Sequence, residues 1–195
     1  MTHWRSFIMA GGALALLAGC APKEKAEVAE KPAEAAFAAV DTNRIATASG
    51  GAEWLTYGGT YDEQRFSTLT GINTENVGRL GVAWTHDLDT NRGVEATPIV
   101  VDGVMYVTSA WSVVYALDAK TGDALWTYDP DVDRAVGVKA CCDVVNRGVA
   151  VLDGKVYVGV IDGRLEALNA KTNGSGARSL STRPSPTRSP AHRAS

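Results

Sequence analysis

A sequence unit occurs twice in this chain, 51 residues apart, and this repetition limits the possible folds more than any other feature. The segment V-D-G-V-M-Y-V at 101–107 returns as L-D-G-K-V-Y-V at 152–158, and A-L-D-A-K-T at 116–121 returns as A-L-N-A-K-T at 167–172. Alternating β-branched and aromatic residues between tight D-G and K-T-G turns are typical of antiparallel strands. Repeated four-strand units of this length predict an all-β fold made of β-propeller blades, and their regularity argues against an ordinary β-sandwich.

Two tryptophans extend this pattern. Trp126 follows the K-T-G turn of the first unit, in its fourth strand, and we expect it to dock against the neighbouring blade. Trp84, in the segment L-G-V-A-W at 80–84, is predicted to end an earlier strand of similar type. The repeat pattern therefore reaches upstream of its first complete unit.

The second unit breaks off after Thr172. Residues 173–195 contain four Arg, six Ser and three Pro, with no acidic residue and no Phe, Tyr or Trp. A disordered linker is one interpretation of this composition. A frameshift is the other interpretation. If each codon is read from the third base of one tail codon and the first two bases of the next, permitted codon choices can encode K-R-V-W-S near the start and T-G-A-P-R near the end. We predict that 173–195 is a disordered, out-of-frame tail.

Residues 1–20 resemble a bacterial lipoprotein signal peptide. A short polar start with Arg5 precedes an apolar stretch too short to span a bilayer, and the segment ends L-A-G-C at 17–20. Cys20 is then the lipidation site and the mature N-terminus; an ordinary signal peptide with a chance cysteine is the alternative. The lipid anchor predicts a periplasmic protein attached to a bacterial membrane, in a compartment where disulfides persist.

The following segment, 21–48, is predicted to be a disordered tether. It is rich in Ala, Glu, Lys and Pro with almost no aromatic residues, so it cannot bury enough apolar surface to offset the entropy of ordering. Isolated helical turns are compatible with that role. The folded region is then 49–172. A net charge of −3, without a basic stripe interleaved with aromatic residues, excludes nucleic acid as a partner.

Several short motifs lie in this folded region. They are W-L-T-Y-G-G at 54–59, R-F-S at 65–67, G-V-E-A-T-P at 93–98 and C-C-D-V-V-N-R-G at 141–148. Together they resemble quinoprotein alcohol dehydrogenases, and the last motif is highly specific, whereas the D-G-x-x-Y-V repeat is common to many propellers. The resemblance implies an eight-bladed β-propeller that binds pyrroloquinoline quinone (PQQ) near its axis. This chain would hold only its N-terminal blades.

The adjacent cysteines Cys141 and Cys142 match a functional position of that family. There, a disulfide between neighbouring cysteines forms one face of a sandwich around the flat cofactor, and a tryptophan from a distant blade forms the other. The resemblance implies this disulfide and this role for Cys141 and Cys142. Two reduced, buried cysteines are the alternative, because a bridge between neighbours closes a strained ring.

Two charged residues also match cofactor-binding positions of the family. Glu95 matches a glutamate that hydrogen-bonds PQQ, and Arg147 matches an arginine near the PQQ carboxylates and the disulfide. A guanidinium suits such a role because it binds carboxylates in a fork. The alternatives are a capped or paired loop acid for Glu95 and a structural salt bridge, for instance to Asp143, for Arg147.

The activity implied by the resemblance is oxidation of a small alcohol to an aldehyde. In the family, Ca²⁺ or a lanthanide polarises the quinone, an aspartate takes the hydroxyl proton, and electrons leave one at a time, usually to a cytochrome c. The metal ligands, the catalytic aspartate and the second tryptophan come from later blades, so we assign no catalytic or metal-binding residue here. Two blades of eight cannot close a ring, and we expect the chain alone to be inactive.

A non-catalytic propeller lipoprotein is the second hypothesis. Scaffolds of the outer-membrane assembly type share the lipoprotein signal and the D-G-x-x-Y-V repeats. Glu95 and the C-C-D-V-V-N-R-G run discriminate between the two hypotheses, since a scaffold has no reason to keep them. They favour the dehydrogenase.

Overall fold

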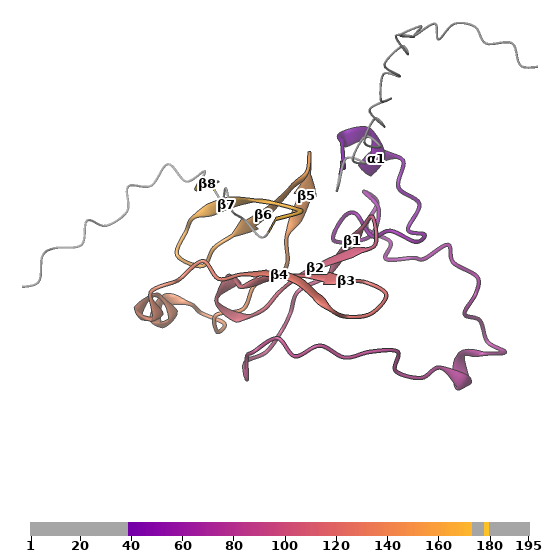
Figure 1. The fold of residues 1–195 in the computed structure, drawn as a ribbon, viewed down its shortest axis with the longest axis horizontal. Coiled ribbons are helices and arrows are strands. Elements are labelled where there is room, and N and C mark those ends of the chain that lie inside the picture. The colour runs from indigo at the N-terminus through magenta and orange to yellow at the C-terminus, as the bar shows by residue number, and fades with distance from the viewer. Residues whose placement is uncertain (1–38, 173–177, 180–195) are drawn as a thin grey trace, which may run out of the picture. The chain divides into compact units, whose positions relative to one another are not determined.

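Two four-stranded antiparallel sheets form the main part of the structure (Figure 1). The computed structural model describes residues 39–172 and 178–179. The first sheet contains β1 (Ile99–Val101), β2 (Val104–Thr108), β3 (Val114–Asp118) and β4 (Ala124–Tyr128), and the second contains β5 (Ala150–Leu152), β6 (Lys155–Gly159), β7 (Leu165–Asn169) and β8 (Arg178–Ser179). In both sheets the strands pair in chain order, each antiparallel to the next. The repeat therefore folds as two propeller blades, as predicted.

Each blade turns between its first two strands at an Asp-Gly pair. The backbone φ angle is +50° at Asp102 and +77° at Gly103, and it is +47° at Asp153 and +70° at Gly154. Two successive positive φ values belong to two-residue hairpin loops whose twist matches that of the strands, and Asp-Gly adopts them at low cost. The turns fix the register, so equivalent residues of the two repeats pair in the same way.

The core lies between the two sheets and consists mainly of valines. Its buried members include Val101, Val104, Tyr106, Val114 and Trp126 from the first sheet and Val151, Val156, Val158 and Leu168 from the second. Trp126 is 6% exposed, and its Nε1 donates a 2.9 Å hydrogen bond to the carbonyl oxygen of Ala170. The Tyr106 hydroxyl donates to the same oxygen over 3.2 Å. Docking of Trp126 against the neighbouring blade is confirmed.

Polar groups join the two blades as well. Glu166 on β7 is 3% exposed and accepts hydrogen bonds from Arg164 Nη1, at 2.6 Å, and from the Tyr128 hydroxyl of β4. Arg164 also donates to Asp162 at 2.8 Å and to the carbonyl oxygen of Pro130 at 2.7 Å. Burial, reinforced by the hydrogen bond to Glu166, raises the pKa of Tyr128 well above its usual value.

Short helices occupy the connections. They are the α-helix α1 (Thr42–Ala46) and the 3-10 helices η1 (Val77–Arg79), η2 (Ala110–Ser112) and η3 (Arg134–Lys139). Asp41 caps α1, because its carboxylate accepts a 2.6 Å hydrogen bond from the backbone N–H of Arg44. A helix of five residues is marginal by itself, so α1 depends on its contacts with the sheets.

The ordered region begins earlier than the sequence predicts. Val40 is fully buried in the core cluster, and its carbonyl oxygen accepts a 2.8 Å hydrogen bond from the backbone N–H of Asp153. Arg44 forms an ion pair with Asp102 at 2.7 Å. The last part of the predicted tether 21–48 is therefore packed against the blades, which corrects the predicted boundary. Composition missed this because the contacts come from a few residues at the end of the segment: Val40 in the core, Ile45 and Ala48 packed against it, and Arg44 in its ion pairs.

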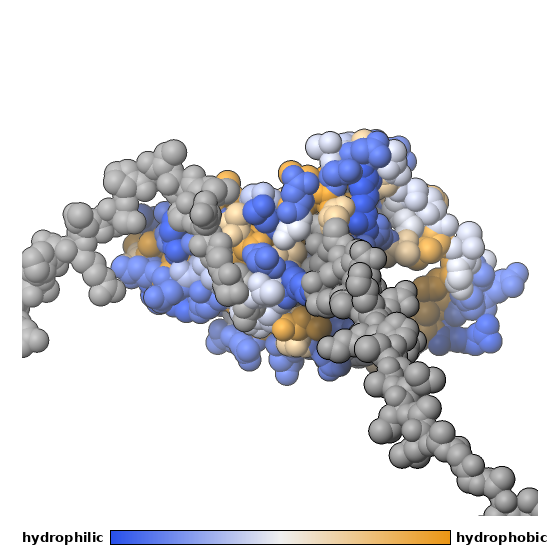
Figure 2. Space-filling view, turned by 45° about the horizontal axis from the view of Figure 1, so that its top comes forward, coloured by the Kyte–Doolittle hydropathy of each residue, from blue (hydrophilic) through white to orange (hydrophobic). Residues whose placement is uncertain are grey.

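A long irregular segment separates Trp54 from β1. The backbone of Trp54 exchanges two 2.9 Å hydrogen bonds with Val100 of β1. Several large apolar side chains of the following segment are exposed: Phe66, Leu69, Ile72, Val77, Leu80 and Val82. On the face drawn in Figure 2, apolar areas lie interspersed with hydrophilic ones. The strand predicted to end at Trp84 pairs with no strand of the described residues.

The strand β8 lies inside the segment for which the sequence predicts no structure. It pairs with β7 at the position that β4 occupies beside β3 in the first blade. The predicted tail, 173–195, thus contributes two paired residues, and its other members lie outside the described residues. The frameshift stays a prediction.

The N-terminal predictions also fall outside the described residues. The signal peptide 1–20, the lipidation of Cys20 and most of the tether stay predictions. Within the described part of the chain, no helix has the length and apolar character needed to cross a bilayer.

Candidate functional site

The motif C-C-D-V-V-N-R-G forms a loop between the two blades, and Asn146 fixes it in place. The Nδ2 atom of Asn146 donates to the Ser112 hydroxyl at 3.1 Å and to the Gly159 carbonyl oxygen at 2.9 Å. Its Oδ1 atom accepts from the Thr108 hydroxyl and from the backbone N–H of Gly148, both at 2.9 Å. One side-chain amide therefore uses both its donors and its acceptor to tie the loop to β2, η2 and the end of β6.

Trp111 of η2 supports the same loop. Its backbone N–H donates a 2.9 Å hydrogen bond to the carbonyl oxygen of Val144. The guanidinium carbons of Arg134 and Arg92 lie 4.3 and 5.8 Å from the centre of its ring. Arg92 also forms an ion pair with Asp143, directly after the two cysteines. Asp143 thus pairs with Arg92, and the alternative in which it pairs with the arginine of the motif is wrong.

Arg147 lies beside Glu95 instead. Its Nη2 atom is 3.1 Å from Glu95 Oε2, and the two side chains are 70% and 44% exposed. The backbone two residues after Glu95 also contacts Arg147, because the Thr97 N–H donates a 3.3 Å hydrogen bond to the Arg147 carbonyl oxygen. The structure therefore brings two predicted cofactor-binding residues together, with Glu95 as a paired loop acid. An exposed ion pair contributes at most about 1 kcal/mol, so both side chains can turn toward a ligand.

Cys141 and Cys142 complete this group. Their Sγ atoms are 2.7 Å apart and not bonded to each other, and both residues are exposed, which corrects the alternative of two buried cysteines. The pKa of the Cys142 thiol is raised, mainly by its contact with Cys141. The nearby charge of Glu95 also raises this pKa, whereas the positive charge of Arg147 lowers it. Arg147 and Glu95 are thus close enough to Cys142 for their charges to act on its thiol. We call these four residues the candidate site; the disulfide stays a prediction.

Two residues that the sequence did not single out border the candidate site. The guanidinium carbon of Arg65 lies 4.2 Å from the centre of the Tyr57 ring. Hydrogen bonding to Arg65, and then its charge, lower the pKa of Tyr57, with smaller contributions from Thr97 and Arg147. Tyr57 and Arg65 lie within the motifs W-L-T-Y-G-G and R-F-S. The motifs therefore drew attention to this part of the chain, but they assigned no role to either residue.

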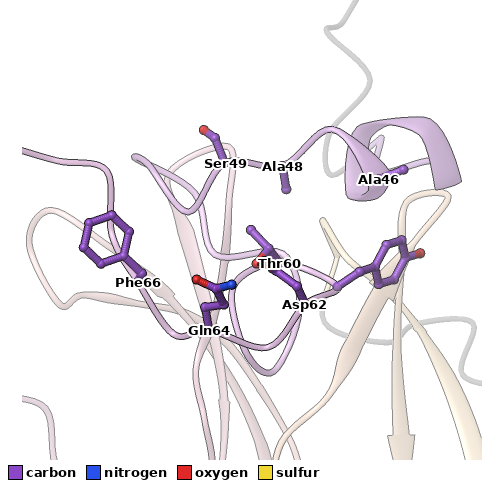
Figure 3. A pocket seen from close by; sticks show the side chains of 8 residues that line it. Ala46, Ala48, Ser49, Thr60, Asp62, Gln64 and Phe66 are labelled. Carbon is purple, nitrogen blue, oxygen red and sulfur yellow. Dashed lines mark hydrogen bonds between the residues drawn. The ribbon is translucent and has the colours of Figure 1, made fainter.

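A separate hollow of 380 Å³ lies between the end of α1 and the loop 60–66 (Figure 3). Ala48 and Ser49 lie on one side of it and Thr60 and Gln64 on the other. Its single acidic residue already accepts a hydrogen bond from the Thr60 hydroxyl. It is lined by no cationic residue and by no member of the candidate site. This hollow lacks the convergent charged groups that a ligand with several carboxylates requires.

The two four-stranded blades define a β-propeller architecture, and three of the four candidate-site residues lie on the loop that connects them. The family described as "Glucose/ethanol/alcohol dehydrogenase, beta-propeller domain", of the PQQ type, matches residues 54–180. This range includes both blades and the whole candidate site. The chain belongs to the PQQ-dependent alcohol dehydrogenase family.

Relatives of known activity share this region. Over 130 residues the chain is 63% identical to the quinohemoprotein alcohol dehydrogenase ADH-IIG of Pseudomonas putida, which covers 67% of this chain and 18% of that protein. The solved structure of ADHIIG matches with a TM-score of 0.69 at 55% identity, over 76% of this chain and 22% of that one. The quinohemoprotein alcohol dehydrogenase of Comamonas testosteroni is 54% identical over 161 residues, covering 80% of this chain and 23% of that protein.

The name of a third relative includes cytochrome c. The 1-butanol dehydrogenase (cytochrome c) of Thauera butanivorans is 60% identical over 126 residues, covering 64% of this chain and 18% of that protein. The chain thus spans about a fifth of the length of the relatives it matches.

Proposed function

We propose that this chain is the N-terminal part of a PQQ- and Ca²⁺-dependent alcohol dehydrogenase that oxidises small alcohols to aldehydes and passes the electrons to a cytochrome c. The observation that carries the proposal is the exposed ion pair of Arg147 with Glu95, in a loop that also carries the exposed, adjacent cysteines Cys141 and Cys142. Family membership and the 54–63% identity to named alcohol dehydrogenases support the class of reaction.

The chemistry of the candidate site fits a flat molecule with several carboxylates. Arg147 is exposed over 70% of its side chain, so its guanidinium can leave Glu95 and bind a carboxylate through two parallel hydrogen bonds. Glu95 then offers acceptor oxygens to a donor group of the cofactor. The two exposed sulfurs of Cys141 and Cys142 provide a polarisable contact surface without strong hydrogen-bonding groups.

The reaction would require both the bound cofactor and residues beyond this chain. When bound, PQQ supplies the two-electron oxidant; the alcohol loses two electrons and two protons, and the electrons pass to cytochrome c. Among the described residues, no group of three or more His, Cys, Asp and Glu side chains could hold a metal ion. As the resemblance to the family implies, we place the Ca²⁺ ligands, the proton-accepting aspartate and the second aromatic face in later blades beyond this chain. We expect the chain alone to be inactive.

Binding of PQQ to the whole chain tests the candidate site. We expect saturable quenching of tryptophan fluorescence on titration with PQQ, and an affinity at least about tenfold weaker in Arg147→Ala, because a charged bidentate contact contributes about 1.5–3 kcal/mol. Arg79→Ala removes an exposed arginine from η1 and serves as the matched control. Equal affinities in the two variants, or no binding by the wild type, would contradict the proposal.

Turnover measurements test the predicted inactivity. The whole chain, supplied with PQQ, Ca²⁺, ethanol and a dye acceptor, should give no reduction of the dye above a protein-free control. Measurable turnover would show that the catalytic groups we place beyond this chain lie within it.

The periplasmic location and the lipid anchor rest on the segment L-A-G-C at 17–20. Mass spectrometry of the chain made in a bacterial host should show acyl groups on Cys20 and no residues before it. Cys20→Ser should move the chain from the membrane fraction to the soluble fraction. Unchanged membrane attachment of this variant would contradict lipidation.

The out-of-frame tail rests on the loss of the repeat after Thr172. Sequencing the DNA around that codon tests it. We expect an open alternative frame that restores the missing tryptophan of the repeat. A gene with no alternative frame open would leave 173–195 as a true linker.

A further inference from the structure

A second hollow, with two cationic residues in its wall, lies beside the candidate site. It has a volume of 500 Å³, which is in the range of small-ligand sites. Arg92, Arg134, Trp111 and Val138 line it, and we call it the arginine pocket. It shares no lining residue with the candidate site. Its two arginines distinguish it from the hollow beside α1, which has no cationic residue in its wall.

Trp111 enters the wall of this pocket from an unusual backbone conformation. The φ angle is +64° at Trp111 and +64° at Ser112. A bulky residue rarely adopts such a value, and the strain persists only where the surrounding structure enforces it, commonly at functional sites. Here the Trp111 N–H donates a 2.9 Å hydrogen bond to the Val144 carbonyl oxygen, and the Ser112 hydroxyl accepts from the Ile161 N–H at 3.2 Å. These contacts hold the half-buried indole at the pocket.

The edge of the indole is fixed as well. It packs on Gly137 so closely that a Cβ at this position would lie 2.8 Å from the indole atom Cη2 and 3.2 Å from Val144 Cγ1. Val144 is itself 3% exposed. The ring therefore rests on a glycine and a buried valine that both line the pocket, and it forms a rigid platform there.

This platform positions two guanidinium groups. The guanidinium carbons of Arg134 and Arg92 lie 4.3 and 5.8 Å from the centre of the Trp111 ring. Stacking on an aromatic face restrains a guanidinium while its N–H groups, which lie in its own plane, stay available as donors. A bound ligand then costs less side-chain entropy, because the group is already oriented.

The charges of the pocket do not balance. Arg92 forms an ion pair with Asp143, which also lines the pocket. Arg134 is exposed and forms no ion pair with any described residue. Two guanidinium groups and one carboxylate leave one positive charge, so the pocket favours an anionic ligand.

The rest of the wall is apolar. Val138 is 87% exposed and lies at the pocket together with Trp111 and Val144. A purely inorganic anion would leave these side chains in water. An anion with a short hydrocarbon chain would cover them and gain the free energy of apolar burial.

We propose that the arginine pocket binds the carboxylate of a small organic acid, with Arg134 as the main carboxylate-binding residue. Arg134 donates two parallel N–H bonds to the carboxylate, Arg92 adds its charge, and the hydrocarbon chain packs against Val138 and the edge of Trp111. The ligand class is a free monocarboxylate with a short aliphatic chain.

Titration of the whole 195-residue chain with butyrate tests the pocket. The signal is the indole N–H resonance of Trp111 in an NMR spectrum, assigned by its loss in Trp111→Phe. We expect a saturable shift with a dissociation constant of about 1 mM, as for a small ligand with one charged contact. Formate, which lacks the chain, should bind at least about threefold more weakly. The neutral isostere 1-butanol should produce no saturable shift.

Two pairs of variants locate the binding groups. Arg134→Ala should weaken butyrate binding at least about tenfold, whereas Arg79→Ala removes an exposed arginine of η1 and should leave it unchanged. Val138→Asp keeps both guanidinium groups but places a competing carboxylate at the pocket, and it should also weaken binding at least about tenfold. Val82→Asp, at a residue that is 82% exposed and outside the pocket, is its control. Circular dichroism checks that each variant keeps the two sheets.

Three results would overturn the proposal. They are the absence of a saturable shift with butyrate, binding of formate or 1-butanol as tight as that of butyrate, and an affinity for butyrate that neither Arg134→Ala nor Val138→Asp changes. PQQ is absent from every sample, so the outcome is independent of the proposed function.

Discussion

The side-chain amide nitrogen of Asn146 lies 2.9 Å from the carbonyl oxygen of Gly159, and this contact joins the loop of the candidate site to the second blade. The same amide reaches Ser112 and Thr108 of the first blade. Asn146 is therefore the point at which the loop meets both blades. Since the next residue is Arg147, the orientation of the predicted carboxylate-binding group depends on this junction.

Replacement of Asn146 should destabilise the chain markedly. Asn146→Ala removes four hydrogen bonds and leaves the fully buried hydroxyls of Ser112 and Thr108 with fewer partners. We expect the free energy of unfolding to fall by about 2–4 kcal/mol, measured by urea unfolding. The exposed Asn91→Ala is the control and should change it by less than about 0.5 kcal/mol. A similar, small loss in both variants would mean that water replaces the missing contacts.

The sequence predicted the features that depend on local patterns. The Asp-Gly turns and the docking of Trp126 followed from a repeat that is visible in the chain itself. The role of Asn146 did not follow, because its partners on other elements lie 13 to 38 residues away and meet only in the fold. The order around Val40 was missed because composition averages over a segment, whereas a few residues at its end, Val40 and Ile45 among them, contact the blades.

The buried tyrosines should make the fold sensitive to high pH. Burial is the main cause that raises the pKa of both Tyr106 and Tyr128. In the unfolded chain tyrosine ionises at about pH 10. The folded state holds these protons more tightly, so their contribution to stability is complete below about pH 10 and is lost as the pH rises through the higher folded-state values. We expect the free energy of unfolding to decline steadily above about pH 10.

Tyrosine variants separate this effect from general alkaline damage. Tyr106→Phe and Tyr128→Phe should each flatten the decline of unfolding free energy with pH, whereas the exposed Tyr61→Phe should leave it unchanged. Tyr57, whose pKa is lowered by its contact with Arg65, should be the first to show tyrosinate absorbance, before any unfolding. An alkaline slope that is the same in the doubly substituted chain and the wild type would contradict this account.

Val40 offers a test of where the folded region begins. Val40→Ala removes two methyl groups from a fully buried position and should lower the free energy of unfolding by about 1–3 kcal/mol. Val138→Ala makes the same chemical change at a position that is 87% exposed and should have almost no effect. Equal stabilities in the two variants would contradict this boundary and would support the original prediction of a disordered tether up to residue 48.

Two glycines allow a matched test of the docking of Trp84. Gly122 and Gly103 have φ angles of +79° and +77°, so alanine at either position carries a similar strain of about 1–2 kcal/mol. Only at Gly122 does the new Cβ collide with a ring, 2.4 Å from Trp84, whereas nothing lies within 4 Å of a Cβ on Gly103. We therefore expect Gly122→Ala to be about 1–3 kcal/mol less stable than Gly103→Ala.

Repeating this pair of glycine variants in a Trp84→Ala background assigns the difference to its cause. Without the indole, the Cβ at Gly122 meets no ring, so the two glycine variants should become equally stable in urea unfolding, as in a double-mutant cycle. The red shift in tryptophan emission expected for Gly122→Ala, as Trp84 moves into water, should disappear with the indole. If the stability difference persists in the Trp84→Ala background, the cost at Gly122 arises elsewhere, and the contact of Trp84 with Gly122 does not account for it.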